Sequence, residues 1–538
     1  MPERPGNCKV TDADAVGEPV ERQVVGALGA IGSATLTSRV LGFVRDMVVA
    51  LVFGAGAATD AFFVAFRIPN ILRRLLAEGA LSTALIPTFS DYAVNQSRVE
   101  LVRMCRAVFG AALIALVTAT VIGVIVAPGI VAVIAPGFVA VPGQAPLTVT
   151  LTRVMFPYLV LVGVAALAMG ALNAQGRFFA PALGPAALNL GMIAGTLGLA
   201  GFVEPPVVAL AVGVLVGGLG QVLVQLPSLA RCGLLVSPST EWRHPAVGRA
   251  ARLLLPAVFG LASVQVMVFV NTLLASLLPV GSISYLYYAD RVMEFPLGVF
   301  GIALASASLP AMSRQAARGD TRGVLETLNL TLRLAIFVSV PATVGLIALD
   351  RPMIAVLFER GRFGPEDAAA TAWALVWFAA GLVGFAGARI VAQAFYAVGA
   401  AGTAVRLGAI AVAANVVAAI ALMPVMGYAG LAAASSLGAW LNLALLLWGA
   451  RRRFGPLGGR ALAISTCRTL LASIAPAVWC GANLWATLPE ADASAWLRGV
   501  WLAYAIGGGV LLFWLASALL GCPERRALLG ILPRRRTR

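Results

Sequence analysis

Lysine, histidine and charged residues of both signs are scarce in this sequence. The 538 residues include one lysine, Lys9, and one histidine, His244, and only 12% of the residues are charged. A soluble domain typically carries about 25% charged residues, so the composition excludes a soluble enzyme. A single histidine also excludes a histidine proton relay. Because none of the six cysteines forms a C-x-x-C pair, no zinc or other metal site is expected.

Long polar stretches are rare beyond residue 22. Residues 1–22 form a polar tail without the apolar core of a signal peptide. Hydrophobic residues make up 60% of the chain and the mean hydropathy is +0.92, which excludes disorder. Because a helix needs about 20 apolar residues to cross a bilayer, we expect an all-α integral membrane protein with about fourteen transmembrane helices, approximately 24–53, 57–91, 104–134, 149–173, 181–202, 206–229, 249–278, 284–312, 327–349, 367–398, 403–423, 427–450, 461–487 and 496–521.

Arginine is distributed unevenly over the connections between these helices. If the N-terminus is cytoplasmic, every second connection is cytoplasmic, and these connections carry most of the arginines outside the spans. The opposite connections 136–147, 279–284 and 424–427 hold no charged residue, and residues 350–367 balance arginine with acidic side chains. Positive residues accumulate on the cytoplasmic side of membrane proteins. Both termini are therefore predicted to be cytoplasmic, with residues 523–538 as a basic tail.

The sequence contains an internal repeat. Residues 84–90 (ALIPTFS) resemble residues 307–313 (ASLPAMS), and residues 171–176 resemble residues 394–399, at the same offset of 223 residues. An even number of helices per repeat preserves the orientation of each copy. The repeat predicts two pseudo-symmetric six-helix lobes, residues 23–230 and 245–452, and two extra helices within residues 458–522. Paired lobes are typical of alternating-access transporters, which bind substrate between them.

Several predicted spans hold charged residues far from their ends. An arginine at the centre of a helix costs about 2.5–3.5 kcal/mol on insertion scales, so these side chains must face protein or a water-filled cavity. Two interpretations remain open. In the first, these side chains line a cationic binding cavity. In the second, they form internal ion pairs or extend to the membrane interface. The residues concerned are Arg39, Arg45, Asp46, Asp60, Arg67, Arg73, Arg74, Glu78, Asp290, Arg291, Glu294 and Arg389.

A cationic cavity would suit a phosphate or pyrophosphate. Guanidinium stays charged at any relevant pH and binds phosphate oxygens through paired donors. The polar head of a lipid could then occupy the cavity while its tail remains in the bilayer. The two helices within residues 458–522 could form an apolar groove for that tail.

The first charged block also carries a family resemblance. Residues 38–46 (SRVLGFVRD), 53–56 (FGAG) and 59–74 (TDAFFVAFRIPNILRR) are similar to the MurJ (MviN) lipid II flippase family, and residues 78–80 (EGA) and 287–296 (YYADRVMEFP) fit the same pattern. The resemblance runs from about residue 25 to about residue 520. It implies the fold of the multidrug/oligosaccharidyl-lipid/polysaccharide exporter superfamily. It also implies a transporter, not an enzyme, that moves the undecaprenyl-pyrophosphate-linked peptidoglycan precursor from the inner to the outer leaflet.

The resemblance assigns substrate-binding residues by position. The cavity arginines correspond to Arg39, Arg45, Arg73 and Arg291, and the basic position of the tenth helix corresponds to Arg389. Acidic partners correspond to Asp46, Asp60 and Asp290, and the matching motifs add Ser38, Glu78 and Glu294. No catalytic residue and no metal ligand is implied.

The resemblance also sets expectations for location, partners and energy. It implies a multi-pass protein of the bacterial inner membrane, a monomer that contacts lipid II, membrane lipids and proteins of cell-wall synthesis, and no nucleic acid. No organic cofactor is expected. Membrane potential is the expected energy source, with sodium as the alternative coupling ion.

Other classes of function are weighed by the same residues. Within the superfamily, the alternatives are a flippase for another polyprenyl-linked glycan and a multidrug antiporter, although an antiporter of organic cations would need carboxylates in its cavity. A glycan-transferring membrane enzyme would need an extracytoplasmic domain, and the longest outer connection, residues 350–367, is too short for one. A scaffold for cell-wall proteins would leave the arginines within the spans unexplained.

Overall fold

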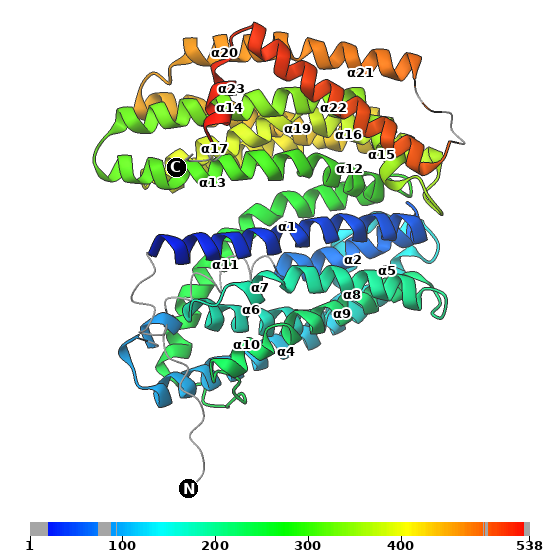
Figure 1. Ribbon diagram of the computed structural model, residues 1–538. Helices are drawn as coiled ribbons and strands as arrows, with labels where there is room; N and C mark the ends of the chain where they lie inside the picture. Colours follow the sequence, from blue (N-terminus) through cyan, green and yellow to red (C-terminus); the bar gives the residue numbers. More distant parts are fainter. Residues whose placement is uncertain (1–19, 74–87, 93, 488, 490–492, 532–538) are drawn as a thin grey trace. The chain divides into compact units, whose positions relative to one another are not determined.

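The computed structural model describes residues 20–73, 88–92, 94–487, 489 and 493–531 (Figure 1). Within these residues every regular element is a helix, as the sequence predicts. The contacts divide the chain into two units, Met1–Val280 and Gly281–Arg538. Glu78 and residues 84–87 of the repeat lie outside the described residues, as does most of the polar tail at residues 1–22.

The described helices of the first unit range from four to 37 residues in length. Its helices are α1 (Val20–Phe53), α2 (Ala57–Arg73), α4 (Arg98–Ile134), η2 (Pro136–Ala140), α5 (Gln144–Met155), α6 (Tyr158–Ala174), α7 (Phe179–Ala182), α8 (Gly184–Leu199), α9 (Val207–Leu223), α10 (Leu226–Arg231) and α11 (Pro245–Ser276). Helix α1 packs against α8, and α8 packs against α9.

The second unit begins one residue before α12. Its helices are α12 (Ser282–Pro296), η3 (Leu297–Gly301), α13 (Ile302–Ala317), α14 (Thr321–Ala348), α15 (Asp350–Phe358), α16 (Pro365–Ala380), α17 (Leu382–Ala397), α18 (Ala401–Met426), α19 (Tyr428–Phe454), α20 (Gly459–Ala472), α21 (Ile474–Ala486), α22 (Ala495–Leu519) and α23 (Pro523–Ile531). The π-helical turn η3 follows Pro296 directly and joins α12 to α13. The lobe boundaries inferred from the repeat stay a prediction.

Many of these helices can cross a membrane. Nine helical segments among the described residues are long and apolar enough to do so, and a tenth is added if α16 and α17, bent by 41°, form one span. Helices α1, α2 and α12 are not among them, although they carry the buried or half-buried charges Arg45, Asp46, Asp60, Arg67, Arg73, Asp290, Arg291 and Glu294. The finding supports a multi-pass membrane protein.

Small residues set the distance between α8 and α9. A Cβ atom built on Gly195 would lie 2.6 Å from the Cα atom of Gly213, and Gly191 faces Gly217 one turn away. Pairs of glycines four residues apart let membrane helices approach until their backbones touch. Helices α8 and α9 therefore form a closely packed hairpin, in which larger side chains do not fit at these positions.

Two local geometries recur at the offset of the sequence repeat. Gly176 and Gly399 have φ of +71° and +70°, and the next residue donates its N–H to the carbonyl of Leu172 or Phe395. Such a turn satisfies carbonyls at a helix end and favours glycine. Ser97 and Asp320 likewise cap α4 and α14 by accepting from the third helical N–H. These matches support a repeat of about 223 residues.

A buried ion pair fastens α23 to the second unit. The Glu524 side chain is fully buried, and its Oε1 accepts from Arg333 Nε on α14 at 2.6 Å and from Ser465 Oγ on α20 at 2.8 Å. Nearby, Phe337 and Phe513 pack together with Cys522, and Leu528 of α23 covers them. Residues 523–531, predicted as part of a tail, are thus a docked helix.

Candidate functional site

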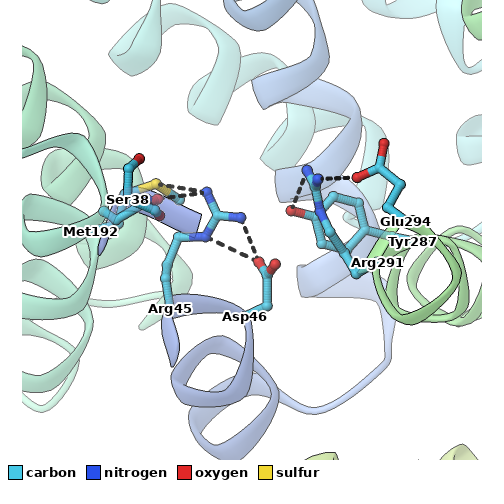
Figure 2. A network of polar contacts seen from close by, with 8 residues as sticks. Ser38, Arg45, Asp46, Met192, Tyr287, Arg291 and Glu294 are labelled. Carbon is cyan, nitrogen blue, oxygen red and sulfur yellow. Dashed lines mark hydrogen bonds and ion pairs between the residues drawn. The ribbon is translucent and has the colours of Figure 1, made fainter. Parts of the chain in front are cut away.

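Arg45 and Asp46 form a buried ion pair on α1. The two residues are adjacent, so their side chains leave an ideal helix about 100° apart. The long arginine side chain closes that gap, and its Nε and Nη2 donate to Asp46 Oδ1 at 3.0 and 2.6 Å (Figure 2). Arg45 is 8% exposed and Asp46 is 2% exposed. The carboxylate offsets the cost of burying the guanidinium.

Helix α8 supplies further partners of Arg45. Its Nη1 donates to Asn189 Oδ1 at 3.2 Å and lies 3.8 Å from Met192 Sδ. The same asparagine donates from Nδ2 to the backbone carbonyl of Ser38 at 3.1 Å. Ser38 and Met192 lie beside the arginine in Figure 2. A network from two helices thus fixes the direction of one guanidinium.

Arg291 has hydrogen-bond partners on its own helix. Its Nη1 donates to Glu294 Oε2 at 2.7 Å, its Nη2 donates to Tyr287 Oη at 3.3 Å, and the guanidinium lies 5.0 Å from the centre of the Tyr287 ring (Figure 2). Three- and four-residue spacings place these side chains on one helical face. The Arg291 side chain is 31% exposed and that of Glu294 is 43% exposed. The pair is therefore half-buried.

Further charged residues of α2 are also engaged. Asp60, in the first turn of α2, is 2% exposed. Arg67 donates to the hydroxyl of Thr272 on α11, and Arg73 Nε donates to Asn70 Oδ1 at 3.1 Å. For Arg67, this contact favours the interpretation of an internal structural partner over that of a cavity residue.

The other predicted site residues are placed as follows. Arg39 on α1 and Arg389 on α17 are exposed, while Ser38 and Asp290 are half-buried. An exposed side chain can face either a cavity or the membrane interface. Both interpretations therefore stay open for Arg39 and Arg389. Glu78 lies outside the described residues.

Sequence reasoning missed Asn189 and Tyr287. Asn189 lies 144 residues after Arg45, in an apolar, glycine-rich segment where nothing predicts its partner. The available signal was weak: an uncharged polar residue within a membrane span, which needs a hydrogen-bond partner there. Tyr287 was part of the quoted motif, and its place four residues before Arg291 could have predicted the contact.

A charged network lies around the N-terminal ends of α4 and α11 in the first unit. Asp91 Oδ2 accepts from Arg249 Nη1 at 2.7 Å, and Glu241 Oε2 accepts from Arg103 Nε at 3.1 Å. Hydrogen bonds with Asn95 and Arg249 lower the pKa of Asp91. His244 caps α11, because its Nδ1 accepts from Ala246 N–H at 3.2 Å while Nε2 lies 3.1 Å from Glu100. The network joins α4 to the loop before α11.

The arrangement suits anion binding more than catalysis. Buried or half-buried guanidinium groups, each held by a carboxylate, can bind phosphate oxygens through charge-assisted hydrogen bonds. Among the described residues, no cluster of three or more histidine, cysteine or acidic side chains could hold a metal ion.

Comparison with known proteins identifies the family. Residues 49–503 match the family model "Lipid II flippase MurJ". The "Probable lipid II flippase MurJ" of Vibrio cholerae is 38% identical over 503 residues, which cover 91% of this chain and 95% of that protein.

Solved structures show the same fold. "Lipid II flippase MurJ, inward closed conformation" matches with a TM-score of 0.77 at 22% identity, covering 93% of this chain and 99% of that one. An inward-facing multidrug resistance MATE family transporter of the MOP superfamily matches with a TM-score of 0.62 at 19% identity, covering 78% and 96%. The fold is that of a membrane transporter, and the chain belongs to the MurJ lipid II flippase family, whose members are transporters and not enzymes.

Proposed function

We propose that this chain flips lipid II from the inner to the outer leaflet of the bacterial inner membrane. Its family membership supports the substrate. The observation that carries the proposal is the buried Arg45, because a guanidinium enclosed in a membrane helix bundle is costly and such residues mark substrate pathways.

The site we propose is a cationic cavity that binds the pyrophosphate. Arg45 and Arg291 contribute oriented guanidinium groups, and the carboxylates of Asp46 and Glu294 hold them while no phosphate is bound. We include the other residues assigned by family resemblance as members of the same site, namely Ser38, Arg39, Asp60, Arg73, Glu78, Asp290 and Arg389. Alternating exposure of this cavity to the two leaflets moves the head group, while the lipid tail stays in the bilayer.

We propose fourteen transmembrane helices with both termini in the cytoplasm. Nine or ten segments pass a test of length and apolarity. Helices α1, α2, α11 and the combination of α12 with α13 supply the remaining four spans. Three of these carry Arg39, Arg45, Arg73 and Arg291 of the proposed site, while Arg389 lies on α17. The arginine-rich connections support the orientation.

Membrane potential is the energy source that we propose, with sodium as the alternative. One charge that crosses a potential of 100 mV gains or loses about 2.3 kcal/mol. A change of this size shifts the populations of two conformations about fiftyfold. Cell-wall synthesis proteins are the proposed protein partners of this chain, and a monomer is the proposed functional form.

The test is lipid II flipping by purified protein in liposomes. Fluorescent lipid II in the inner leaflet is protected from a membrane-impermeant reductant, so flipping appears as loss of protection. We expect the Arg45→Ala, Arg291→Ala double variant to lose at least nine-tenths of the flipping rate, an effect of about 1.4 kcal/mol or more. Full activity in this variant would refute the anion-binding site.

A matched control removes the same charge elsewhere. The Arg322→Ala, Arg406→Ala double variant neutralises two exposed arginines and should flip lipid II at the wild-type rate. Measuring the flipping rate with and without an imposed membrane potential tests the first energy source. Measuring it after sodium is replaced by potassium tests the second. Competition with a different polyprenyl-linked glycan and with a cationic drug tests the two alternatives within the superfamily.

A further inference from the structure

Asn189 links α8 to α1 through one side chain. Its Oδ1 accepts from Arg45 Nη1 at 3.2 Å, and its Nδ2 donates to the Ser38 carbonyl at 3.1 Å. The side chain is 7% exposed. It also lies against Gly42, where an added Cβ would come within 3.3 Å of Nδ2. Both ends of the amide are therefore committed, and the amide can rotate only if both hydrogen bonds break.

The helix that carries Asn189 is itself closely packed. Gly191 and Gly195 of α8 face Gly217 and Gly213 of α9 with no room for side chains. Close backbone packing limits small adjustments, since interiors respond to strain by discrete rearrangement. Asn189 thus transmits the position of the α8–α9 hairpin to Arg45.

The chemistry of the acceptor matters as much as its position. An amide oxygen orients a guanidinium without adding negative charge, whereas a second carboxylate beside Asp46 would over-compensate Arg45 and repel an anionic ligand. Hydrogen bonds to charged groups are stronger than those between neutral groups. A neutral acceptor on a rigid helix is therefore suited to hold a guanidinium that must also bind phosphate.

We propose that Asn189 is a positioning residue for Arg45, which holds the guanidinium in the direction in which it binds the pyrophosphate of the substrate. The proposal rests on the proposed function of the Arg45 site. Asn189 acts through Arg45 and does not itself contact the lipid. Met192, whose sulfur lies 3.8 Å from the same nitrogen, completes the contact surface on α8.

A double-mutant cycle on lipid II binding tests this role. Asn189→Leu keeps the approximate volume of the side chain and removes both hydrogen bonds. We expect the dissociation constant for fluorescent lipid II, measured on full-length protein in nanodiscs, to rise about tenfold. In an Arg45→Ala background the same substitution should change the constant less than about twofold, because the group through which Asn189 acts is gone.

Equal losses in the two backgrounds would overturn the proposal, because a merely structural role does not depend on Arg45. If Asn189→Leu does not fold, Asn189→Ser is used, whose hydroxyl is too short to bridge Arg45 and Ser38, and the same dependence on Arg45 is expected. Unchanged binding in either folded variant also overturns the role.

Thr196→Val is the matched control on the same helix. Thr196 is 1% exposed, and its hydroxyl has no hydrogen-bond partner among the described residues. The substitution removes a buried polar group of α8 without touching Arg45, so lipid II binding should stay within about twofold of wild type. A loss equal to that of Asn189→Leu would show that any polar truncation on α8 weakens binding, and would overturn the specific role. If the wild type itself neither binds nor flips lipid II, the proposed function fails instead.

Discussion

The two units support their arginines in opposite ways. Arg45 is buried, and its partners come from two helices that are far apart in the sequence. Arg291 is half-buried, and its assigned partners Tyr287 and Glu294 lie within four residues on the same helix. A tertiary network fixes a side chain against the surrounding fold, whereas a local pair moves with its helix. The contacts of Arg45 thus tie two helices together, whereas the contacts of Arg291 with Tyr287 and Glu294 lie within one helix.

The largest expected effect comes from removing one carboxylate in each unit. Asp46→Asn leaves the buried Arg45 without its negative partner, and loss of one member of a buried ion pair costs about 3–5 kcal/mol. Glu294→Gln removes a partner whose side chain is 43% exposed, and such a pair contributes about 1 kcal/mol or less. Thermal unfolding in detergent, followed by tryptophan fluorescence, should show a much larger decrease in midpoint for Asp46→Asn. Equal decreases would contradict the distinction between a buried and a half-buried ion pair.

A smaller effect is expected from the packing that supports Asn189. A Cβ at Gly195 would lie 2.6 Å from Gly213 Cα, so Gly195→Ala should separate α8 from α9 and lower stability by about 1–3 kcal/mol. The flipping rate should also decrease, because the partner of Arg45 moves with α8. Gly198→Ala serves as the control, since nothing lies within 4 Å of its added methyl. Similar behaviour of the two alanine variants would indicate that the hairpin does not support Arg45.

The smallest effects concern two carboxylates outside the spans, with opposite dependence on pH. The pKa of Asp91 in the first unit is lowered by hydrogen bonds from Asn95 and Arg249. Its ionised form therefore stabilises the folded protein at pH values above 3.8, the ordinary pKa of an aspartate. This stabilisation is lost as the pH falls through the lower pKa of the folded state. Burial raises the pKa of Asp350 in the second unit, so its ionised form lowers stability above the raised pKa and that penalty disappears as the pH falls.

Unfolding midpoints measured from about pH 7 down to about pH 3 test both signs. Asp91→Asn should lower the midpoint at neutral pH and reduce the loss on acidification. Asp350→Asn should raise the midpoint at neutral pH and remove the part of the pH dependence that belongs to this carboxylate. The prediction fails if both substitutions shift the neutral midpoint in the same direction.

The sequence predicts local features of this molecule better than distant ones. The helices follow from apolar runs. The pairing of Arg291 with Glu294 was not predicted, although their spacing of three residues on one helix could have indicated it. The family resemblance also placed Arg45 and Asp46 in the candidate site. The contact of Arg45 with Asn189 could not be predicted, because it depends on how α1 and α8 pack, and nothing near position 189 indicates a charged neighbour. Likewise, the sequence did not predict that Arg67 contacts Thr272 on α11.

The buried carboxylate of Glu524 has a practical consequence for the end of the chain. Its partner Arg333 belongs to α14, and the Arg333 side chain is only 20% exposed. A stop codon or a protease cut before residue 523 would remove the counter-ion and leave a largely enclosed positive charge on α14 without this carboxylate. Removing α23 is therefore not neutral, and an affinity tag is better appended after residue 538 than substituted for this helix.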